Sequence, residues 1–331
     1  MPLIGREVQL IRYPEGAVRP DDFRVAEVPV RGPGPGQVLV RNTWTSVDPA
    51  LRLRLARQAP AGYFAAFPLA AAMDGIMTVG EVVESGAAGF APGDSVWHAS
   101  GWRDYAVVDA GKPALSGLGT LTRLDTRLAP VQRYLGPLGG MGLTAYAGLW
   151  HAASLREQDV VWVSSAAGAV GSLAAQFAKI RGCRVIGSAG SDEKVAYLLG
   201  ELGLDAAFNY KAGRVAELVR QAAPDGIDVY FDNVGGDHLS AALAVLRRWG
   251  RVALCGAVSS TTAPARRRAP ATCSRPPPTT LPCAASAAAA TCICCARCSR
   301  RWRAGCGRES CATGRRSPRD CRTPRWRWSS S

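Results

Sequence analysis

Cysteine and histidine are almost missing from the first 260 of the 331 residues. Cys183 and Cys255 are the only cysteines in that stretch, and the whole chain has three histidines, His98, His151 and His238. Zinc sites in proteins are built from these side chains at short spacing, so we predict no metal site and a structural role for His98. A body so poor in cysteine needs no disulfides, which is typical of the reducing cytosol.

Long apolar runs are also missing. No stretch approaches the roughly 18 apolar residues of a membrane span, and the first residues, MPLIGREVQLIRYPEG, lack the apolar core of a secretory leader. Neither a Gly-x-Ser-x-Gly elbow nor a GxxxxGK[ST] loop occurs, which disfavours hydrolases of those two types. We therefore expect a cytoplasmic protein with no membrane partner.

Acidic residues and lysine are scarce in one region only. Residues 261–331 contain 15 of the 40 basic residues, all arginine, but two of the 26 acidic ones, Glu309 and Asp320. Residues 1–260 are left with 25 basic and 24 acidic residues and are nearly neutral. The net charge of +14 thus belongs to the tail, and the body suits an enzyme for small neutral substrates better than a nucleic-acid-binding protein.

Two rhythms divide the body. Residues 1–125 hold short β-type runs at 38–40, 78–83 and 105–108, separated by Gly- and Pro-rich turns. This pattern predicts a mostly β, partly open barrel and leaves its strand order open. Residues 126–260 alternate between strand and helix patterns. Strands are expected at 159–165, 183–190, 206–210, 227–236 and 251–258, and helices at 168–182, 191–203, 215–222 and 239–249. The predicted fold class is α/β, with a doubly wound parallel sheet.

The segment Ser-Ser-Ala-Ala-Gly-Ala-Val-Gly, residues 164–171, follows one such strand and opens a helix. In this context glycines let a dinucleotide approach the backbone: Gly168 would face the pyrophosphate, and Gly171 would let the helix pack closely on the strand. The N–H groups of Gly168, Ala169, Val170 and Gly171 would then face the phosphates. Ala166 replaces the first glycine of the usual pattern, and a plain strand-to-helix turn is the alternative.

The end of the second strand bears on the choice between NAD and NADP. An acid there normally binds the ribose hydroxyls of NAD, but here the strand ends Ser-Ala-Gly and Lys194 lies in the first turn of the next helix. A lysine can pair with the 2′-phosphate of NADP, although a solvated surface lysine is the alternative. Asp192 is the counter-argument for NAD, yet its place fits an acid that complements the helix dipole.

These stretches together resemble the zinc-independent medium-chain reductases, a family that includes prostaglandin reductases, leukotriene B4 12-hydroxydehydrogenase and bacterial curcumin or 2-alkenal reductases. The matching segments are SVDPALRLRL, TVGEVVES, GLTAYAGL, SSAAGAVGS, GSAGSDEKVAYL, DAAFNYK, YFDNVGG and GRVALCGAV, which span most of residues 1–258. The resemblance implies a GroES-like domain over residues 1–125 and a Rossmann domain over residues 126–260.

The resemblance also implies a function. NADPH would deliver hydride to the C=C bond of an α,β-unsaturated ketone or aldehyde, with hydrogen-bond donors polarising the carbonyl. Lys194 and Tyr210 would bind the 2′-phosphate, and Asn233, Cys255 and Gly256 would line the cofactor. Tyr63 stands near the family's pocket tyrosine, though a plain core or rim aromatic is favoured for it. No catalytic residue is assigned. Members are often homodimers, but no interface can be inferred from the residues.

Residues 261–331 do not fit this pattern. They contain one Leu, one Ile and no Val, Phe, Tyr or Met, so no folded core is expected. Our hypothesis is an out-of-frame translation: read one base earlier, every Cys or Trp codon becomes NTG, which encodes Leu, Val or Met. With GC-rich codons, residues 292–313 decode as MHLLRAMLAALARWLREGKLRY, an amphipathic helix followed by a strand. A product lacking this segment is expected to be unstable and inactive.

The cysteines and arginines of the tail suggest two other functions. Its cysteine cluster at residues 292–298 could bind a soft metal, and its arginines could bind nucleic acid; both are disfavoured. The alternative to a reductase is therefore a non-enzymatic NADPH-binding protein, or a nucleic-acid-binding protein that uses the tail.

Overall fold

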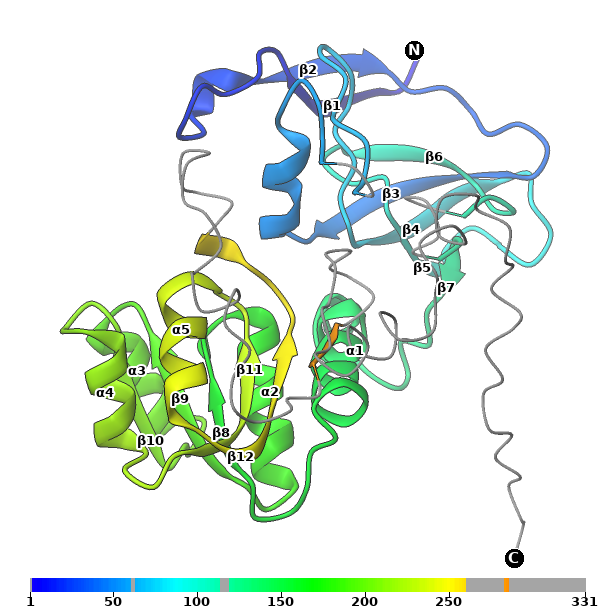
Figure 1. Ribbon diagram of the computed structural model, residues 1–331. Coiled ribbons are helices and arrows are strands. Elements are labelled where there is room, and N and C mark those ends of the chain that lie inside the picture. The colour runs from blue at the N-terminus through cyan, green and yellow to red at the C-terminus, as the bar shows by residue number, and fades with distance from the viewer. Residues whose placement is uncertain (1, 61–62, 114–118, 260–282, 286–331) are drawn as a thin grey trace, which may run out of the picture. The chain divides into compact units, whose positions relative to one another are not determined.

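The computed structural model describes residues 2–60, 63–113, 119–259 and 283–285 (Figure 1). Two sheet-bearing parts follow one another along the chain, and each is described by itself. Most of the expected out-of-frame tail, residues 261–282 and 286–331, lies outside the described residues. Among those that are described, no helix has the length and apolar character needed to cross a membrane.

The N-terminal part is built from antiparallel strands. β1 (Ile4–Leu10) pairs with β2 (Phe23–Pro29), and a five-stranded sheet has the order β6-β3-β4-β5-β7. Its strands are β3 (Gln37–Thr45), β4 (Thr78–Ser85), β5 (Ser95–His98), β6 (Tyr105–Asp109) and β7 (Thr122–Arg123). The three strands predicted at residues 38–40, 78–83 and 105–108 are confirmed, and the strand order, which the sequence left open, is now settled.

Alternation of apolar side chains explains the core of this sheet. Val38 and Val40 on β3, Val82 on β4 and Val96 on β5 are fully or almost fully buried, because residues two apart on a strand face the same side. Two short 3-10 helices, η1 (Pro20–Asp22) and η2 (Pro49–Arg54), lie between the strands. Leu51 of η2 packs in a second apolar cluster.

The second part is a doubly wound parallel sheet with the order β10-β9-β8-β11-β12-β13. Its helices are α1 (Gly140–Tyr146), which continues as the π-helix η4 (Ala147–Ala152), α2 (Ala169–Ile180), α3 (Asp192–Gly200), α4 (Val215–Ala222) and α5 (Gly236–Val245). Its strands are β8 (Val160–Val163), β9 (Arg184–Ala189), β10 (Ala206–Asn209), β11 (Ile227–Asp232), β12 (Leu246–Leu254) and β13 (Cys283–Ala285). A 3-10 turn, η3 (Val131–Leu135), precedes α1. This order reverses direction between β8 and β11, the position where dinucleotide folds bind their ligand.

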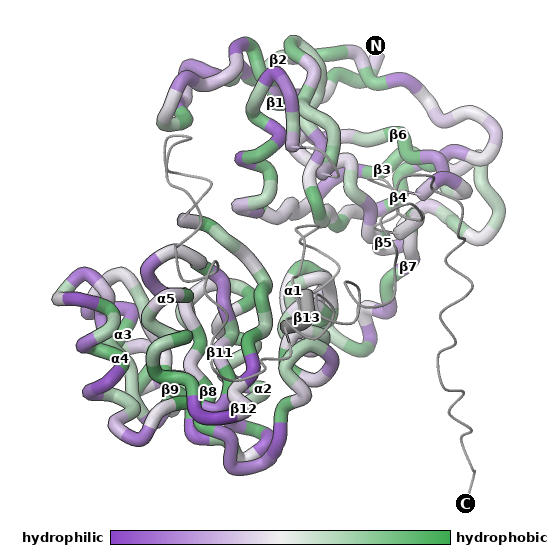
Figure 2. Tube along the Cα trace, in the orientation of Figure 1, coloured by the Kyte–Doolittle hydropathy of each residue, from purple (hydrophilic) through white to green (hydrophobic). Residues whose placement is uncertain are grey.

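Each face of this sheet has its own apolar layer. Val161 and Val163 of β8 lie in one cluster with α1, α2 and α3, while Val160 and Trp162 lie in the other with α4 and α5. Hydrophilic residues recur along α3 and α4 between the apolar ones (Figure 2). Burial on both faces accounts for the near-continuous apolar composition of the strands.

The last predicted helix, α5, ends earlier than the sequence pattern indicates. A helix over residues 239–249 is predicted, but α5 ends at Val245 and β12 begins at Leu246, so the prediction is wrong for residues 246–249. Arg247 explains the difference, because its guanidinium donates to the carbonyl of Asp225 and pairs with Asp228 at 2.8 Å. These contacts hold a helix-compatible sequence in extended form.

Three residues of the tail form a strand. Cys283–Ala285 pair in parallel with Val252–Leu254 of β12, which departs from the expectation that no part of residues 261–331 folds. Strand pairing uses main-chain N–H and C=O groups, so a segment without large apolar side chains can still occupy the edge of a sheet.

Candidate functional site

The turn between β8 and α2 brings main-chain atoms unusually close together. A Cβ on Gly171 would lie 2.2 Å from the main-chain oxygen of Ser165, whereas one on Gly168 would lie 3.1 Å from the same atom. Gly168 N–H also donates to that oxygen at 2.9 Å, and Ser165 itself has a φ of +50°. Only glycine fits at residue 171. This close approach agrees with the tight packing of helix on strand that the sequence predicts for Gly171.

The first turn of α2 leaves donors available. Gly168 caps the helix with extended backbone and without a side-chain hydrogen bond. Within the described residues, the N–H groups of Ala169 and Val170 have no acceptor, as is normal for the first turn of a helix. These donors and the positive end of the helix dipole favour an anion at this point.

Polar and cationic side chains gather where β9 and β10 end. Ser191 caps α3 by accepting from the N–H of Lys194 at 3.4 Å, as predicted for that serine. Tyr210 N–H donates to Ala189, and the Tyr210 hydroxyl would lie 3.1 Å from a Cβ on Gly190. Glycine at residue 190 therefore makes room for the phenol.

Two lysines belong to the segments that follow β9 and β10, Lys194 in α3 and Lys211 directly after Tyr210. The Lys211 ammonium lies 5.9 Å from the centre of the Tyr210 ring. Lys194 and Lys211 are both exposed, and neither takes part in an ion pair in the part of the chain that the structure describes. Both positive charges remain available to an anion, and the sequence interpretation missed Lys211 although it follows Tyr210 directly in Asn-Tyr-Lys.

The Asp192 carboxylate is engaged by a neighbouring side chain. Its carboxylate accepts from the side-chain amide of Asn209 at 2.9 Å, so it ties the first turn of α3 to the end of β10. An acid held by such a bond stabilises the helix start. This contact weakens the argument for Asp192 as a ribose ligand and hence for NAD.

A second set of contacts joins the ends of β8, β11 and β12. Asn233 donates from its side chain to the carbonyl of Ser164 at 2.7 Å and from its N–H to the Ser164 hydroxyl at 2.9 Å. The N–H groups of Cys255 and Gly256 both donate to the carbonyl of Asp232 at 2.9 Å. The structure thus brings Asn233, Cys255 and Gly256 together at one edge of the sheet.

The Cys255 thiol is not a reactive one. Burial, followed by the charge of Asp232, raises its pKa to about 12. The group therefore stays protonated at neutral pH, and Cys255 contributes shape and main-chain donors rather than a nucleophile.

Tyr63 belongs to the N-terminal part and makes its contacts there. Its hydroxyl donates to the carbonyl of Ala50 in η2 at 3.3 Å, and its ring meets Phe64 edge-on with centroids 5.2 Å apart. Burial raises the pKa of this phenol. These contacts agree with the rim aromatic that the sequence interpretation favours, and they do not join Tyr63 to the cofactor residues.

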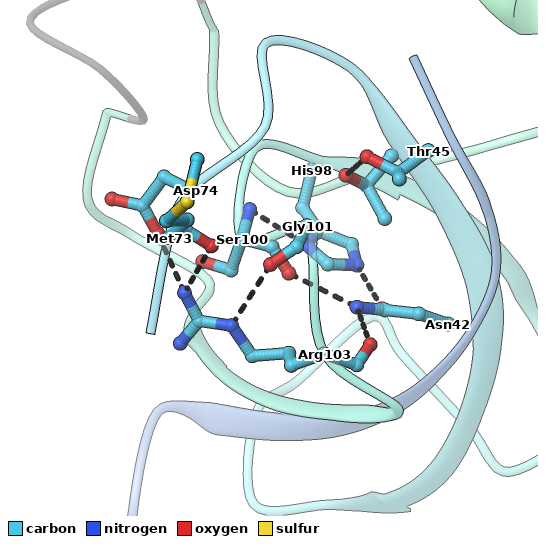
Figure 3. A network of polar contacts seen from close by, with 9 residues as sticks. Asn42, Thr45, Met73, Asp74, His98, Ser100, Gly101 and Arg103 are labelled. Atoms are coloured by element: carbon cyan, nitrogen blue, oxygen red, sulfur yellow. Dashed lines mark hydrogen bonds and ion pairs between the residues drawn. The ribbon is translucent and has the colours of Figure 1, made fainter. Parts of the chain in front are cut away.

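His98 is part of a closed polar network (Figure 3). Its Nδ1 accepts from the N–H of Ser100 at 3.1 Å, so Nε2 carries the proton and donates to the side-chain oxygen of Asn42 at 2.9 Å. Asn42 in turn donates to the carbonyls of Ser100 and Arg103. Burial lowers the pKa of His98 to about 3. Both ring nitrogens are bonded, which confirms the structural role expected for His98.

Metal ligation finds no support in the same region. In the described ranges no group of three or more His, Cys, Asp or Glu side chains could hold a metal ion. The prediction that the chain uses no metal stays a prediction.

Taken as a binding surface, the carboxyl edge of the parallel sheet fits NADP(H). The glycine turn with free N–H groups suits a pyrophosphate, and Lys194, Lys211 and Tyr210 suit a 2′-phosphate. Sequence reasoning missed Ser164 and Asp232. An acid at the end of the buried run IDVYFD, next to the point where strand order reverses, is the signal that could have found Asp232.

Comparison with known proteins agrees with this geometry. A family described as the N-terminal domain of oxidoreductase matches residues 6–115, and a family described as zinc-binding dehydrogenase matches residues 169–273. The second match extends past residue 260, where the resemblance noted from the sequence stops.

Individual relatives cover most of the chain. A 2-alkenal reductase (NADP+-dependent) of Nicotiana tabacum is 38% identical over 259 residues, which are 77% of this chain and 73% of that protein. An NADPH-dependent curcumin reductase of Escherichia coli is 37% identical over 259 residues, or 78% of this chain and 72% of that protein. The crystal structure of CurA from Vibrio vulnificus in complex with NADPH has a TM-score of 0.72 at 33% identity and covers 80% of this chain and 75% of its own.

The fold and the site define a medium-chain dehydrogenase/reductase with a dinucleotide-binding sheet. Within that class, the chain belongs to the zinc-independent family of NADP-dependent oxidoreductases that contains the alkenal, curcumin and prostaglandin reductases.

Proposed function

We propose that this protein reduces the C=C bond of α,β-unsaturated ketones or aldehydes with NADPH. The observation that carries the proposal is the glycine turn of α2 with its free N–H groups, together with Lys194 of α3 and Lys211 after β10, which form no ion pair among the described residues. The names of the relatives, 2-alkenal reductase and curcumin reductase among them, support the choice of substrate class.

NADPH, when bound, supplies a hydride to the β-carbon of the enone. With that hydride the C=C electron pair would move toward the carbonyl oxygen, and the resulting enolate would take a proton from solvent at the α-carbon. In this proposal the N–H groups of Ala169 and Val170 hold the pyrophosphate, and Lys194, Lys211 and Tyr210 hold the 2′-phosphate. The segments at Asn233 and at Cys255–Gly256 line the nicotinamide half of the site.

Cofactor choice and reaction can be tested separately. Quenching of protein fluorescence by NADPH and by NADH measures the preference for the 2′-phosphate, and loss of NADPH absorbance with a series of enals and enones measures turnover. Tight NADPH binding without turnover on any enone would favour the non-enzymatic alternative. Weak, equal binding of both nucleotides would remove the basis of the proposal.

We also propose the domain division at residues 1–125 and 126–260, a cytoplasmic location and a homodimeric state. The division is supported by the absence of any strand or helix between β7, which ends at Arg123, and η3, which begins at Val131. A single species at twice the chain mass in light scattering is the expected result for the homodimer.

We further propose that residues 261–331 are translated out of frame. Support comes from Cys283, the first residue of β13, since every cysteine codon read one base earlier encodes Leu, Val or Met. The nine cysteines and three tryptophans of residues 261–331 would all become such aliphatic side chains in that frame. Sequencing the gene decides the point: an intact frame that encodes residues 261–331 contradicts it.

A further inference from the structure

Asp232, the last residue of β11, is a buried carboxylate held by one of its two oxygens. It is 1% exposed. Oδ1 accepts from the Tyr230 hydroxyl at 2.8 Å and from the N–H groups of Gly235 and Val234 at 2.8 and 3.0 Å, with the Ser164 hydroxyl at 3.5 Å. These donors hold the loop after β11 in one conformation.

The other oxygen has no donor. Among the described residues, nothing donates to Oδ2 of Asp232. The fully enclosed side-chain atoms that lack a partner there are Arg54 Nη1 and Trp102 Nε1, and Asp232 Oδ2 is not one of them. A carboxylate with one saturated oxygen and one open oxygen can still receive a partner on the open side.

The charge of Asp232 has no counter-charge in the described part of the chain, where none of the ion pairs includes it. Buried charges are normally paired. Burial raises the pKa of Asp232, while the donors on Oδ1 lower it. The neighbouring Tyr230 and Cys255 have raised pKa values and stay neutral at neutral pH, so they add no charge to this cluster.

The strand order indicates which ligand would meet this charge. In doubly wound sheets the dinucleotide lies across the carboxyl edge, with its adenosine half over the first three strands and its nicotinamide half over the strands beyond the reversal. Here β8, β9 and β10 form the first half, and β11 and β12 form the second. Asp232 stands at the end of β11, in the nicotinamide half. The oxidised nicotinamide ring is a cation, and the reduced ring is neutral.

We propose that the Asp232 carboxylate is the built-in counter-charge for the oxidised nicotinamide ring and sets the balance between NADP+ and NADPH in this site. This inference rests on the proposed function and adds to it. A fixed negative charge stabilises the positive charge that develops as hydride leaves the ring. Asp232 is then a positioning residue through Oδ1 and an electrostatic one through Oδ2.

Asp232→Asn tests the charge with little change of shape, because the amide keeps a carbonyl oxygen for the donors on Oδ1. Dissociation constants for NADP+ and NADPH are measured by titration calorimetry on the full 331-residue chain. A charge at an effective dielectric of about 20 is expected to change the ratio of the two constants by roughly tenfold. NADP+ should bind more weakly in the variant, and NADPH should be nearly unaffected.

Asp228→Asn is the matched control, because it makes the same chemical change near the amino end of the same strand, where the carboxylate pairs with Arg247. Its ratio of dissociation constants should stay that of the unmodified chain. An unchanged ratio in Asp232→Asn, or equal weakening of both nucleotides, overturns the proposal and leaves Asp232 a purely structural residue.

Two further results remain interpretable. If circular dichroism shows that Asp232→Asn does not fold, Asp232→Ser replaces it, since a serine hydroxyl can still accept from Gly235 N–H, and the same ratio decides. If the unmodified chain binds neither nucleotide, the proposed function itself fails and takes this inference with it. A ratio that does not respond in a chain that binds both overturns the inference alone.

Discussion

The side-chain amide of Asn233 donates to the main-chain carbonyl of Ser164 over 2.7 Å and thereby joins the ends of β11 and β8. These strands flank the point where the sheet reverses its order. The bond fixes the width of the opening in which a dinucleotide would lie. Asn233, which the sequence predicts to line the cofactor, therefore also acts as a clamp: its side chain ties the end of β11 to the end of β8.

Asn233→Ala should loosen this clamp. The substitution leaves the Ser164 carbonyl without its side-chain donor, which costs about 1–3 kcal/mol for a buried group. Urea unfolding should show a lower midpoint, and NADPH affinity should fall. Asn209→Ala is the control, since it removes an amide that bonds Asp192 on the exposed rim; an equal loss of stability in both variants would argue against a special role for Asn233.

Gly171→Ala should abolish NADPH binding. Its Cβ would meet the Ser165 oxygen at 2.2 Å, so the turn must open and the N–H groups of α2 must move. Gly200→Ala makes the same chemical change at the end of α3, where a Cβ has nothing within 4 Å. The control should bind NADPH normally and gain a few tenths to about 1 kcal/mol of stability. Normal fluorescence quenching by NADPH in Gly171→Ala would contradict the assignment of the glycine turn of α2 as the pyrophosphate site.

Lys194→Ala and Lys211→Ala should each weaken NADPH binding by roughly tenfold and leave NADH binding unchanged, because each removes one charge near the proposed 2′-phosphate. Lys112→Ala, at a lysine paired with Asp109 in the N-terminal part, is the control. Equal losses for NADPH and NADH would show that the lysines do not select the 2′-phosphate.

The free energy of unfolding should decrease as the pH is lowered from about 6.5 to about 4. Burial lowers the pKa of His98 to about 3 and that of His238 to about 4, from 6.5. In that window the unfolded chain binds more protons than the folded one, so the free energy of unfolding drops as pH drops. Each pKa unit between the folded and the unfolded chain contributes about 1.4 kcal/mol to the free energy of unfolding. Urea midpoints across this range measure the effect.

A replacement of His98 separates this cause from general acid denaturation. His98→Gln should reduce the slope of stability against pH, whereas His151→Gln, at an exposed histidine, should not. A slope that is the same in both variants and in the unmodified chain would contradict the assignment.

Regular patterns allowed much of the fold to be predicted from the sequence. Val160–Val163 and Ile227–Asp232 are mostly apolar runs between turn signals, and Ser191 caps the helix that follows β9, so strand and helix positions followed directly. Leu246 to Trp249 defeated this reasoning, because tertiary contacts of Arg247 decide their conformation. Local sequence carries no record of such contacts.

The site was predictable where main-chain geometry requires a residue type. Gly171 could be assigned because only glycine tolerates a backbone oxygen at that distance. Asp232 and Lys211 escaped because their roles depend on which strands become neighbours. The out-of-frame hypothesis for residues 261–331 makes a prediction of its own: a frame-restored chain should melt cooperatively at a higher temperature than this one.

The most direct test of the central claim is the fate of the transferred hydrogen. NADPH carrying deuterium on the nicotinamide carbon that donates hydride is incubated with a simple enone and the frame-restored chain, beside the present chain, and the product is examined by NMR. The account predicts a saturated ketone with deuterium on the β-carbon. Deuterium on the carbonyl carbon of an alcohol, or label that stays in the cofactor while the chain binds it, would contradict it.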